Sequence, residues 1–272
     1  MNNKVIVIAG RGNLPKVLIN EMIKKNLDIH ILFIKGNETK NNLLNHSHTI
    51  TSYGSIITKL LNLKKNGFKK IIFAGSLQKP TFKQIRPDFN MIKFLPRLSK
   101  IFLQGGDNRL LSFLIKELES MKFEILNIKE YLSNYFPSHG CITKVRPTKT
   151  ASSDINIGKK ILDNLSPMDV GQAIIVQQGD VLGIEAVEGT DNLIKRTKKF
   201  IKNGERPTLI KLLKKKQDLR ADLPTIGLNT IKLCKKNFIG GIAFSANYTL
   251  FLDFKKIIAE LRKGNFFLYG IK

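Results

Sequence analysis

The segment Lys215–Gly227 holds the most varied set of reactive side chains in the sequence, because basic, acidic, amide and hydroxyl groups surround a proline there. Arg220 can hold a phosphate through charge-assisted hydrogen bonds. Asp222 can activate a water molecule or bind a metal ion. The same residue types also allow an ordinary surface loop with an incidental salt bridge. The segment is therefore a candidate for phosphate chemistry.

A second group of carboxylates follows a predicted strand, in the sequence Glu-Ala-Val-Glu-Gly-Thr-Asp from Glu185 to Asp191. Mg²⁺ in proteins takes one or two carboxylates together with substrate phosphate oxygens, so this group can support such a cation. Thr190 or Asp191 can equally be the N-cap of the helix predicted to follow. Both interpretations stay open.

Two glycine-containing turns follow predicted strands in the first half, at Gly10-Arg11-Gly12 and at Gly75-Ser76. Glycine lets backbone N–H groups approach a phosphate, and the N-terminus of a following helix is electropositive. A tight turn without a ligand is the alternative. The first turn is not a full dinucleotide fingerprint, and no acidic residue ends the second strand, so a nicotinamide cofactor is disfavoured.

A third glycine-containing stretch, Gly105-Gly106-Asp107, interrupts a helical pattern. Asp107 can cap the helix that follows or contact a ligand. The apolar faces on either side, Leu98–Leu103 and Leu110–Leu114, can pack in a core or line a groove, and a core is the commoner use.

Other reactive arrangements have no support in the sequence. The four histidines lack a ligand spacing such as HExxH, and no Ser–His or Cys–His arrangement can be asserted. Cys141 and Cys234 lie far apart, which argues against a CxxC pair and fits a reducing compartment. Zinc and acyl-enzyme chemistry are therefore disfavoured.

The elements that must position these residues alternate between strand and helix in the first half. Apolar, β-branched runs predict strands at Val5–Ala9, Ile29–Ile34 and Lys70–Ala74, and helical periodicity fills the connections, for example at Ile56–Leu63. This order predicts a parallel sheet, whose carboxyl edge is where open α/β sheets bind ligands. Both glycine turns lie at that edge.

The second half predicts a mixed α/β domain, with a helix at Asp154–Leu165 and a hairpin within Ala173–Val187. Residues 133–150 have weak periodicity and contain prolines and a glycine, so we place a linker there. The expected division is a nucleotide-side first domain at 1–132 and a second domain at 151–272 that contains the candidate catalytic segment Lys215–Gly227.

The chain of 272 residues carries a formal charge of +25, which would attract the phosphates of nucleotides, nucleic acids or anionic lipids. Lysine, asparagine and isoleucine are abundant together, as in AT-rich coding sequence, so a solvated lysine surface without a dedicated polyanion partner is the plainer explanation. No apolar run approaches the roughly 20 residues that cross a bilayer, and no signal peptide is recognisable. We expect a cytoplasmic protein.

Taken together, the motifs resemble one family. They are IAGxGxLP from Ile8, FAGSLxKP from Phe73, GGDNxLL from Gly105, EGTD from Glu188 and QDLRADLPTIG from Gln217. EGTD followed by RxDLPTIG is the specific part. In these motifs the chain is similar to the LpxI-type UDP-2,3-diacylglucosamine pyrophosphatases.

The resemblance implies a Rossmann-like N-terminal parallel-sheet domain plus a distinct C-terminal mixed α/β domain, with a lipid-linked UDP-sugar bound between them. It implies hydrolysis of UDP-2,3-diacylglucosamine to UMP and 2,3-diacylglucosamine 1-phosphate (lipid X) in lipid A biosynthesis. It further implies dependence on Mg²⁺ and a cytoplasmic location, peripheral at the inner membrane of a Gram-negative-type cell. The sequence allows a homodimer and points to no dedicated nucleic-acid partner. A basic binding protein without catalysis and a dinucleotide-dependent oxidoreductase are the alternatives.

The resemblance also implies residue roles. Asp222, directly before LPTIG, corresponds to the residue tied to catalysis, and would orient water or hold Mg²⁺. Arg220 and Gln217 would clamp phosphate, and Asp191 with Glu188 would bind or support the metal, whose ligands stay unassigned. Asn108 stands where the family carries a second aspartate, which weakens it as a ligand. The expected substrate-binding residues are Gly10, Gly12, Asn13, Leu14, Pro15, Gly75, Ser76, Asp107, Glu188, Gly189, Thr190, Asp191, Gln217, Arg220 and Thr225.

Overall fold

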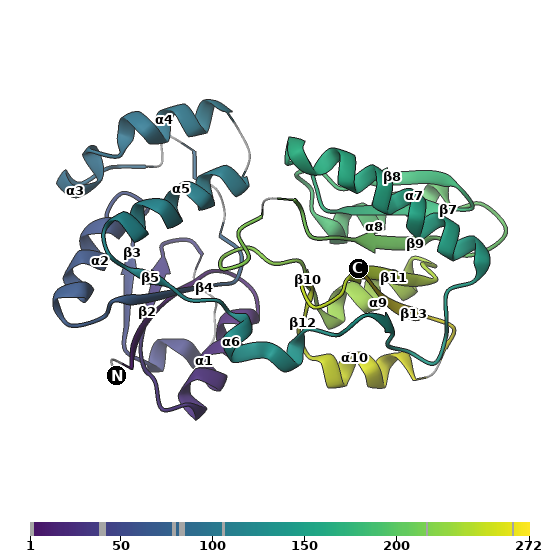
Figure 1. The fold of residues 1–272 in the computed structure, drawn as a ribbon, viewed down its shortest axis with the longest axis horizontal. Coiled ribbons are helices and arrows are strands. Elements are labelled where there is room, and N and C mark those ends of the chain that lie inside the picture. The colour runs from purple at the N-terminus through teal and green to yellow at the C-terminus, as the bar shows by residue number, and fades with distance from the viewer. Residues whose placement is uncertain are drawn as a thin grey trace. The chain divides into compact units, whose positions relative to one another are not determined.

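The computed structural model describes residues 3–37, 42–77, 80–81, 85–104, 107–215, 217–262 and 264–272, without the side chains of 42, 102–104 and 107–109. Its contacts divide the chain into two compact units, which Figure 1 shows as two groups of helices and strands. Unit 1 comprises Met1–Ser133 and Asp218–Asp222, and unit 2 comprises Asn134–Gln217 and Leu223–Lys272. The short segment from the second half is therefore part of the first unit.

Unit 1 is built on a five-stranded parallel sheet with the order β3-β2-β1-β4-β5. Its central strands are continuous apolar runs, as expected for parallel strands buried on both faces. The strand order reverses between β1 and β4, so their carboxyl ends form the switch point at which such sheets bind ligands. The strands are β1 (Lys4–Ala9), β2 (Asp28–Ile34), β3 (His48–Thr51), β4 (Lys70–Ala74) and β5 (Glu124–Ile125).

Helices cover both faces of this sheet. Ile6 and Ile8 of β1 belong to a core cluster with residues of α2 and α5, whereas Val5 and Val7 alternate to the opposite face, where α1 packs. The helices are α1 (Leu14–Lys24), α2 (Ile56–Lys65), α3 (Phe89–Ile92), α4 (Leu95–Gln104), α5 (Asp107–Ser120) and α6 (Lys129–Leu132), with 3₁₀ turns at Asn42–Asn45 and Ser133–Tyr135.

Unit 2 is built on a six-stranded mixed sheet with the order β6-β13-β11-β9-β7-β8. The three central strands β9, β11 and β13 are parallel, and the outer strands run antiparallel to their neighbours. The strands are β6 (Gly140–Cys141), β7 (Ala173–Gln177), β8 (Asp180–Ile184), β9 (Thr208–Lys211), β11 (Gly241–Ser245) and β13 (Phe267–Ile271), with a separate parallel pair of β10 (Thr225–Ile226) and β12 (Leu250–Phe251).

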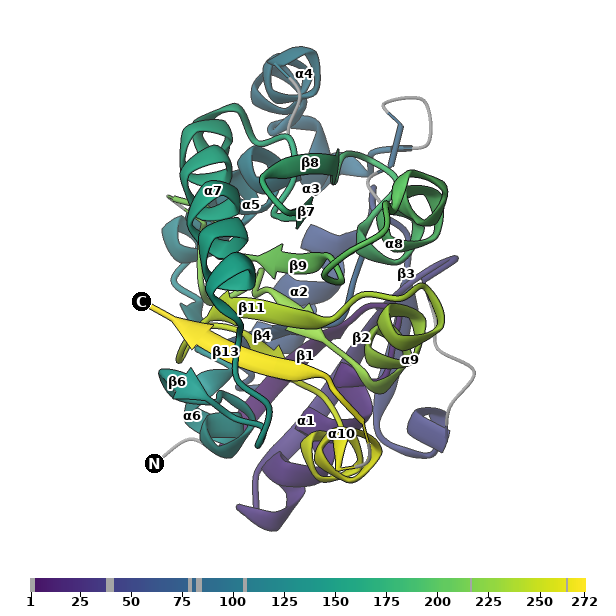
Figure 2. The same ribbon diagram turned by 90° about the vertical axis from the view of Figure 1, so that its right-hand side faces the viewer.

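The sheet of unit 2 lies between two helical layers, as Figure 2 shows. Ile174 and Val176 of β7 face one cluster, which includes α7, and the alternating Ala173 and Ile175 face another, which includes α8, α9 and α10. The helices are α7 (Lys149–Leu165), α8 (Thr190–Thr197), α9 (Leu228–Lys236) and α10 (Phe254–Leu261), with 3₁₀ turns at Ser166–Met168 and Lys198–Phe200. The predicted α/β class, a parallel sheet followed by a mixed one, is confirmed.

The boundary region differs from the expected linker at 133–150. From Asn134 onward the chain belongs to unit 2, where β6 pairs antiparallel with β13. Helix α7 begins at Lys149 rather than Asp154, because the Thr148 side chain accepts a hydrogen bond of 3.0 Å from the backbone N–H of Ala151 and caps the helix. The capping threonine lies inside the region that the sequence suggested as a linker.

Candidate functional site

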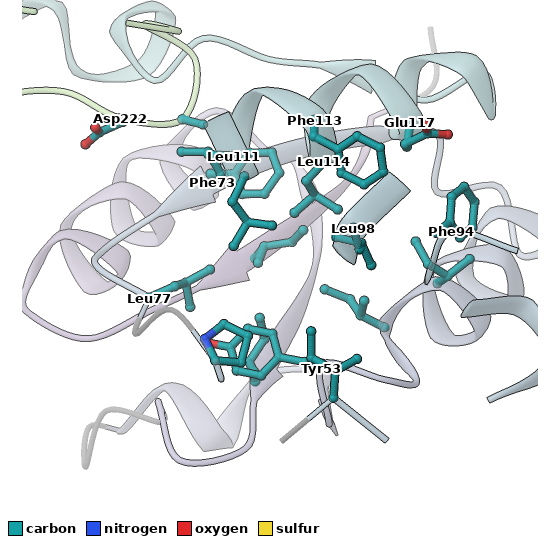
Figure 3. Close-up of a pocket in the computed structure, with 18 of the residues that line it drawn as sticks. Tyr53, Phe73, Leu77, Phe94, Leu98, Leu111, Phe113, Leu114, Glu117 and Asp222 are labelled. Carbon is teal, nitrogen blue, oxygen red and sulfur yellow. The ribbon is translucent and has the colours of Figure 1, made fainter. Parts of the chain in front are cut away.

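A pocket of about 340 Å³ lies in unit 1 at the carboxyl edge of its sheet. Ile8 and Phe73 line it from β1 and β4, and the remaining walls come largely from apolar side chains of α2, α3, α4 and α5. Gly75, Ser76 and Asp222 also line it, and they bring polar atoms to a wall that is otherwise mostly apolar. Figure 3 shows Asp222 at the opposite end of the lining from Phe94 and Glu117.

Asp222 reaches this position because the Asp218–Asp222 segment forms one helical turn on unit 1. The backbone N–H groups of Ala221 and Asp222 both donate to the carbonyl of Asp218, at 3.2 and 3.1 Å. Ala221 packs against the core cluster of the unit. Asp222 is half-buried, and its carboxylate points away from the apolar centre of the pocket in Figure 3.

Arg220 fixes the same turn through two carboxylates. Its guanidinium donates to Asp218 from Nε at 3.0 Å and from Nη2 at 2.8 Å, and to Glu119 of α5 from Nη1 at 2.5 Å. The hydrogen bonds from Arg220 hold the pKa of Asp218 below its usual value, and Asp218 in turn raises the pKa of Arg220. Arg220, the predicted phosphate-binding residue, thus already pairs with two carboxylates. Its contact with substrate stays a prediction.

The two glycine turns bond to each other at the switch point. Arg11 N–H donates to the Ser76 carbonyl at 2.7 Å, and Ser76 N–H donates back to the Arg11 carbonyl at 3.1 Å. A Cβ at Gly10 would lie 2.4 Å from the Ser76 carbonyl oxygen, and one at Gly75 would lie 2.5 Å from the Arg11 carbonyl oxygen. Both glycines are therefore required by close backbone approach, whatever they bind.

The first turn leads directly into α1. Gly12 has a φ of +95°, and a Cβ at this position would meet no atom within 4 Å, so its turn conformation, rather than crowding, requires glycine. Asn13 precedes the helix without a side-chain cap, Leu14 begins it, and Pro15 is buried in its first turn. These residues are brought to the carboxyl edge beside Gly75 and Ser76, as the sequence predicts for a shared ligand edge.

Polar residues that the sequence did not single out complete this edge. Arg11 donates from Nη2 to the Gly36 carbonyl at 2.6 Å, and Asn37 donates to the Tyr53 hydroxyl at 3.2 Å. Tyr53 lines the pocket, and burial raises its pKa, while the Asn37 hydrogen bond and the charge of Arg11 oppose that rise. Nothing in the local sequence distinguishes Tyr53 from an ordinary loop tyrosine.

Unit 2 contains a buried polar network at the carboxyl end of β9. Lys211 Nζ donates to Thr190 Oγ1 at 2.9 Å and to the Thr225 carbonyl at 3.1 Å, and Thr190 Oγ1 donates to Glu185 Oε1 at 2.7 Å. Lys211, Thr190 and Glu185 are all buried. The network joins β9, the start of α8 and β10, and so brings together Thr190 and Thr225 from two separate motifs.

The other residues of the EGTD motif have partners within unit 2. Asp191 accepts from Asn229 Nδ2 at 2.9 Å and from Thr230 Oγ1 at 3.0 Å, which connects α8 to α9. Glu188 pairs with Arg196 at 2.8 Å; a hydrogen bond from its own backbone N–H and then that pair lower its pKa. Gly189 is the N-cap of α8 with a φ of +77°.

Two further predicted site residues are not part of the Lys211 network. One closes a separate loop, and the side chain of the other is not described. Gln217 is buried in unit 2 and accepts a 3.1 Å hydrogen bond from the backbone N–H of Lys214, so it closes its own loop. Asp107 is the first residue of α5, and its side chain is not among those described.

The donor chemistry at Asp222 fits a hard cation. Mg²⁺ binds oxygen ligands and needs only one or two protein carboxylates when substrate phosphates complete its shell. Asp222 supplies such a carboxylate at the pocket that Gly75 and Ser76 also line. Within the described residues no group of three or more His, Cys, Asp or Glu side chains is arranged to hold a metal ion.

Comparison with known proteins covers nearly the whole chain. Residues 4–135 match the family model of the LpxI N-terminal domain, and residues 138–269 match that of the LpxI C-terminal domain. The chain is 31% identical over 215 residues to the UDP-2,3-diacylglucosamine pyrophosphatase LpxI of Caulobacter vibrioides, a match that covers 77% of this chain and 76% of the relative. Both domain matches occur in the order expected from the motifs, and the chain therefore belongs to the LpxI family.

Proposed function

We propose that this protein hydrolyses the pyrophosphate bond of UDP-2,3-diacylglucosamine and releases UMP and 2,3-diacylglucosamine 1-phosphate for lipid A biosynthesis. Membership of the LpxI family and the activity named for the Caulobacter relative support the reaction class. The observation that carries the proposal is Asp222, a carboxylate at an apolar pocket on the ligand-binding edge of a parallel sheet.

The pocket suits the lipid part of this substrate. Its walls consist largely of leucine, isoleucine and phenylalanine side chains, and its volume is at the low end of the roughly 300–1,000 Å³ typical of small-molecule sites. Each methylene group moved from water to such a lining contributes about 0.8 kcal/mol. An acyl chain in the pocket would leave the sugar and phosphates near the polar atoms of Ser76 and Asp222.

The chemistry assigned to Asp222 is water activation. Cleavage of a phosphoanhydride requires an oriented nucleophilic water and neutralisation of the phosphate charge. A half-buried carboxylate can accept a hydrogen bond from that water, and so orient it and take its proton. Asp222 would also help to hold a bound Mg²⁺, which would neutralise charge on the phosphate oxygens.

We also propose that the protein works in the cytoplasm at the inner membrane surface, where a diacylated substrate resides. In the described part of the chain, no helix has the length and apolar character that a membrane crossing requires.

The test is release of UMP from UDP-2,3-diacylglucosamine in detergent micelles with Mg²⁺. We expect Asp222→Asn and Asp222→Ala to lose at least about 10²-fold in kcat, the usual contribution of a general base. Asp180→Ala is the matched control, because Asp180 is an exposed residue at the start of β8 in unit 2 and forms a solvent-exposed ion pair with Lys202 at 2.6 Å.

Wild-type activity that chelation of Mg²⁺ abolishes, with retained activity in the control variant, would support the proposal. A folded, Mg²⁺-supplied wild type that releases no UMP would instead favour a basic binding protein without catalysis. In that case binding to polyanions should fall steeply with salt and survive the loss of Asp222.

A further inference from the structure

Helices α3 and α4 form a two-sided wall of unit 1. On the inner side, Met91, Phe94 and Leu98 are at most 8% exposed and line the apolar pocket. Helix α3 packs on α2, where Asn90 donates to Thr58 Oγ1 at 2.9 Å, and α4 packs on α5. Figure 3 shows Phe94 at the end of the pocket away from Asp222, with Leu98 between them.

The outer side of the same wall exposes large apolar side chains. Phe89 is 88% exposed and Ile92 is 52% exposed, and the two lie three residues apart in one helical turn, so they share a face. Phe89 is far more exposed than Phe200 (48%) or Phe238 (54%) elsewhere in the described chain. A single exposed apolar residue is ordinary, whereas an adjacent pair over an apolar pocket calls for a partner.

Basic residues predominate in the sequence on both sides of this pair. Between residues 85 and 101 the sequence has Arg86, Lys93, Arg97 and Lys100, all exposed, against one acidic residue, Asp88. Asp88 is occupied in capping α3, where it accepts a 3.1 Å hydrogen bond from the Met91 N–H. Arg97 also pairs with Glu117 of α5 at 2.6 Å, which leaves the lysines and Arg86 to dominate the charge. The segment that carries the exposed pair is thus positively charged.

We propose that the outer face of α3 and α4 docks on an anionic phospholipid bilayer. Phe89 and Ile92 enter the headgroup region, and the surrounding lysine and arginine side chains contact lipid phosphates. Because the inner side of the same helices lines the pocket, docking would bring the pocket close to the bilayer that holds the acyl chains. The proposal rests on the proposed function for the identity of that lipid.

The apolar pair and the pocket behind it favour a lipid partner over a nucleic acid. Basic residues alone would serve either polyanion. The inner side of the same helices, however, lines an apolar cavity. A lipid acyl chain can bind in such a cavity, whereas the charged backbone of a nucleic acid cannot. The charge and the apolar face together fit the two parts of a phospholipid surface.

The test is co-sedimentation with vesicles of phosphatidylcholine, with and without phosphatidylglycerol. Wild type should bind the anionic vesicles, and binding should weaken as salt concentration rises. The double variant Phe89→Ser/Ile92→Ser should bind at least about tenfold more weakly, because it loses the inserting side chains. Phe200→Ser is the matched control, since Phe200 is an exposed aromatic residue beside a lysine, with Lys199 Nζ 5.0 Å from its ring centre.

A second variant, Lys93→Glu/Lys100→Glu, reverses two charges without altering the apolar pair, and should also lose binding to anionic vesicles. The proposal would be overturned if wild type did not bind anionic vesicles. It would also be overturned if both the apolar and the charge variants bound them as well as wild type. Circular dichroism verifies that each variant is folded.

Enzyme activity separates this proposal from the proposed function. With substrate in detergent micelles, Phe89→Ser/Ile92→Ser should hydrolyse at the wild-type rate, and with substrate in anionic vesicles it should be slower. Failure of wild type to hydrolyse micellar substrate would contradict the proposed function alone, because the vesicle-binding comparison needs no catalysis.

Discussion

Single glycine positions at the switch point of unit 1 are required by the close approach of two backbone segments. We expect Gly10→Ala to destabilise the protein by about 1–3 kcal/mol, the usual cost of overpacking, because its Cβ would lie 2.4 Å from the Ser76 carbonyl oxygen. Urea unfolding measures the change. Gly36→Ala is the control, because Gly36 has a φ of +84° and a Cβ there would meet no neighbour within 4 Å, so it reports only the backbone strain. Equal costs for the two variants would refute the close-approach explanation.

Asp218 should make stability depend on pH at the acid end. Its folded pKa is below the ordinary value of 3.8, chiefly because Arg220 donates hydrogen bonds to it. A depressed carboxyl pKa contributes stability that is fully present above pH 3.8 and is lost as pH falls through the folded value. Because the pair is partly exposed, we expect Asp218→Asn to cost about 0.5–1 kcal/mol at pH 7 and almost nothing in strong acid.

Urea unfolding at several pH values tests this. In an Arg220→Gln background the effect of Asp218→Asn should shrink, because the partner is already gone. An effect of Asp218→Asn that is constant from about pH 7 to strong acid would contradict the role of the carboxylate charge.

At the scale of elements, the buried hydrogen bonds of Lys211 connect the end of β9 to the start of α8 and to β10. Removing its ammonium group takes a buried donor away from Thr190 Oγ1 and the Thr225 carbonyl, and a buried positive charge away from nearby Glu185. We expect Lys211→Met to lower the free energy of unfolding by roughly 2–4 kcal/mol, the usual range for an uncompensated buried polar or charged group. Lys202→Met is the control, since Lys202 forms an exposed pair with Asp180 and should change stability by less than about 1 kcal/mol. Thermal or urea unfolding distinguishes the two.

For the whole molecule, the sequence predicted the elements that carry strong local signals. The strand at Lys70–Ala74 matches β4, and the hairpin around Gly179-Asp180 matches β7 and β8, because β-branched runs ended by glycine depend little on context. Strand β3 was not predicted. It has only four residues, and it is held by pairing with β2 rather than by its own pattern.

The residues of the candidate site likewise fall into those that the sequence predicts and those that only the folded structure reveals. Motif residues such as Gly75, Ser76 and Asp222 were predicted from type and spacing, and the structure places all three at one pocket. Lys211 was not, because a buried lysine looks the same in sequence as the many exposed ones, and only tertiary packing distinguishes it. The assignment of Asp218–Asp222 to unit 1 also depends on tertiary contacts. Sequence order alone places that segment in the second half of the chain.

Because the Asp218–Asp222 segment belongs to unit 1 but lies within the sequence of unit 2, no single cut in the gene separates the two units. The chain enters unit 2 after Ser133, returns to unit 1 for Asp218–Asp222 and then re-enters unit 2, so one wall of the pocket is encoded inside the other unit. A recombinant exchanging the codons up to Ser133 with those of a relative would pair one protein's pocket with another's Ala221 and Asp222. Substitutions that line this pocket and those in the Asp218–Asp222 segment should therefore be inherited together, and the two halves should behave as one evolutionary unit despite their separate cores.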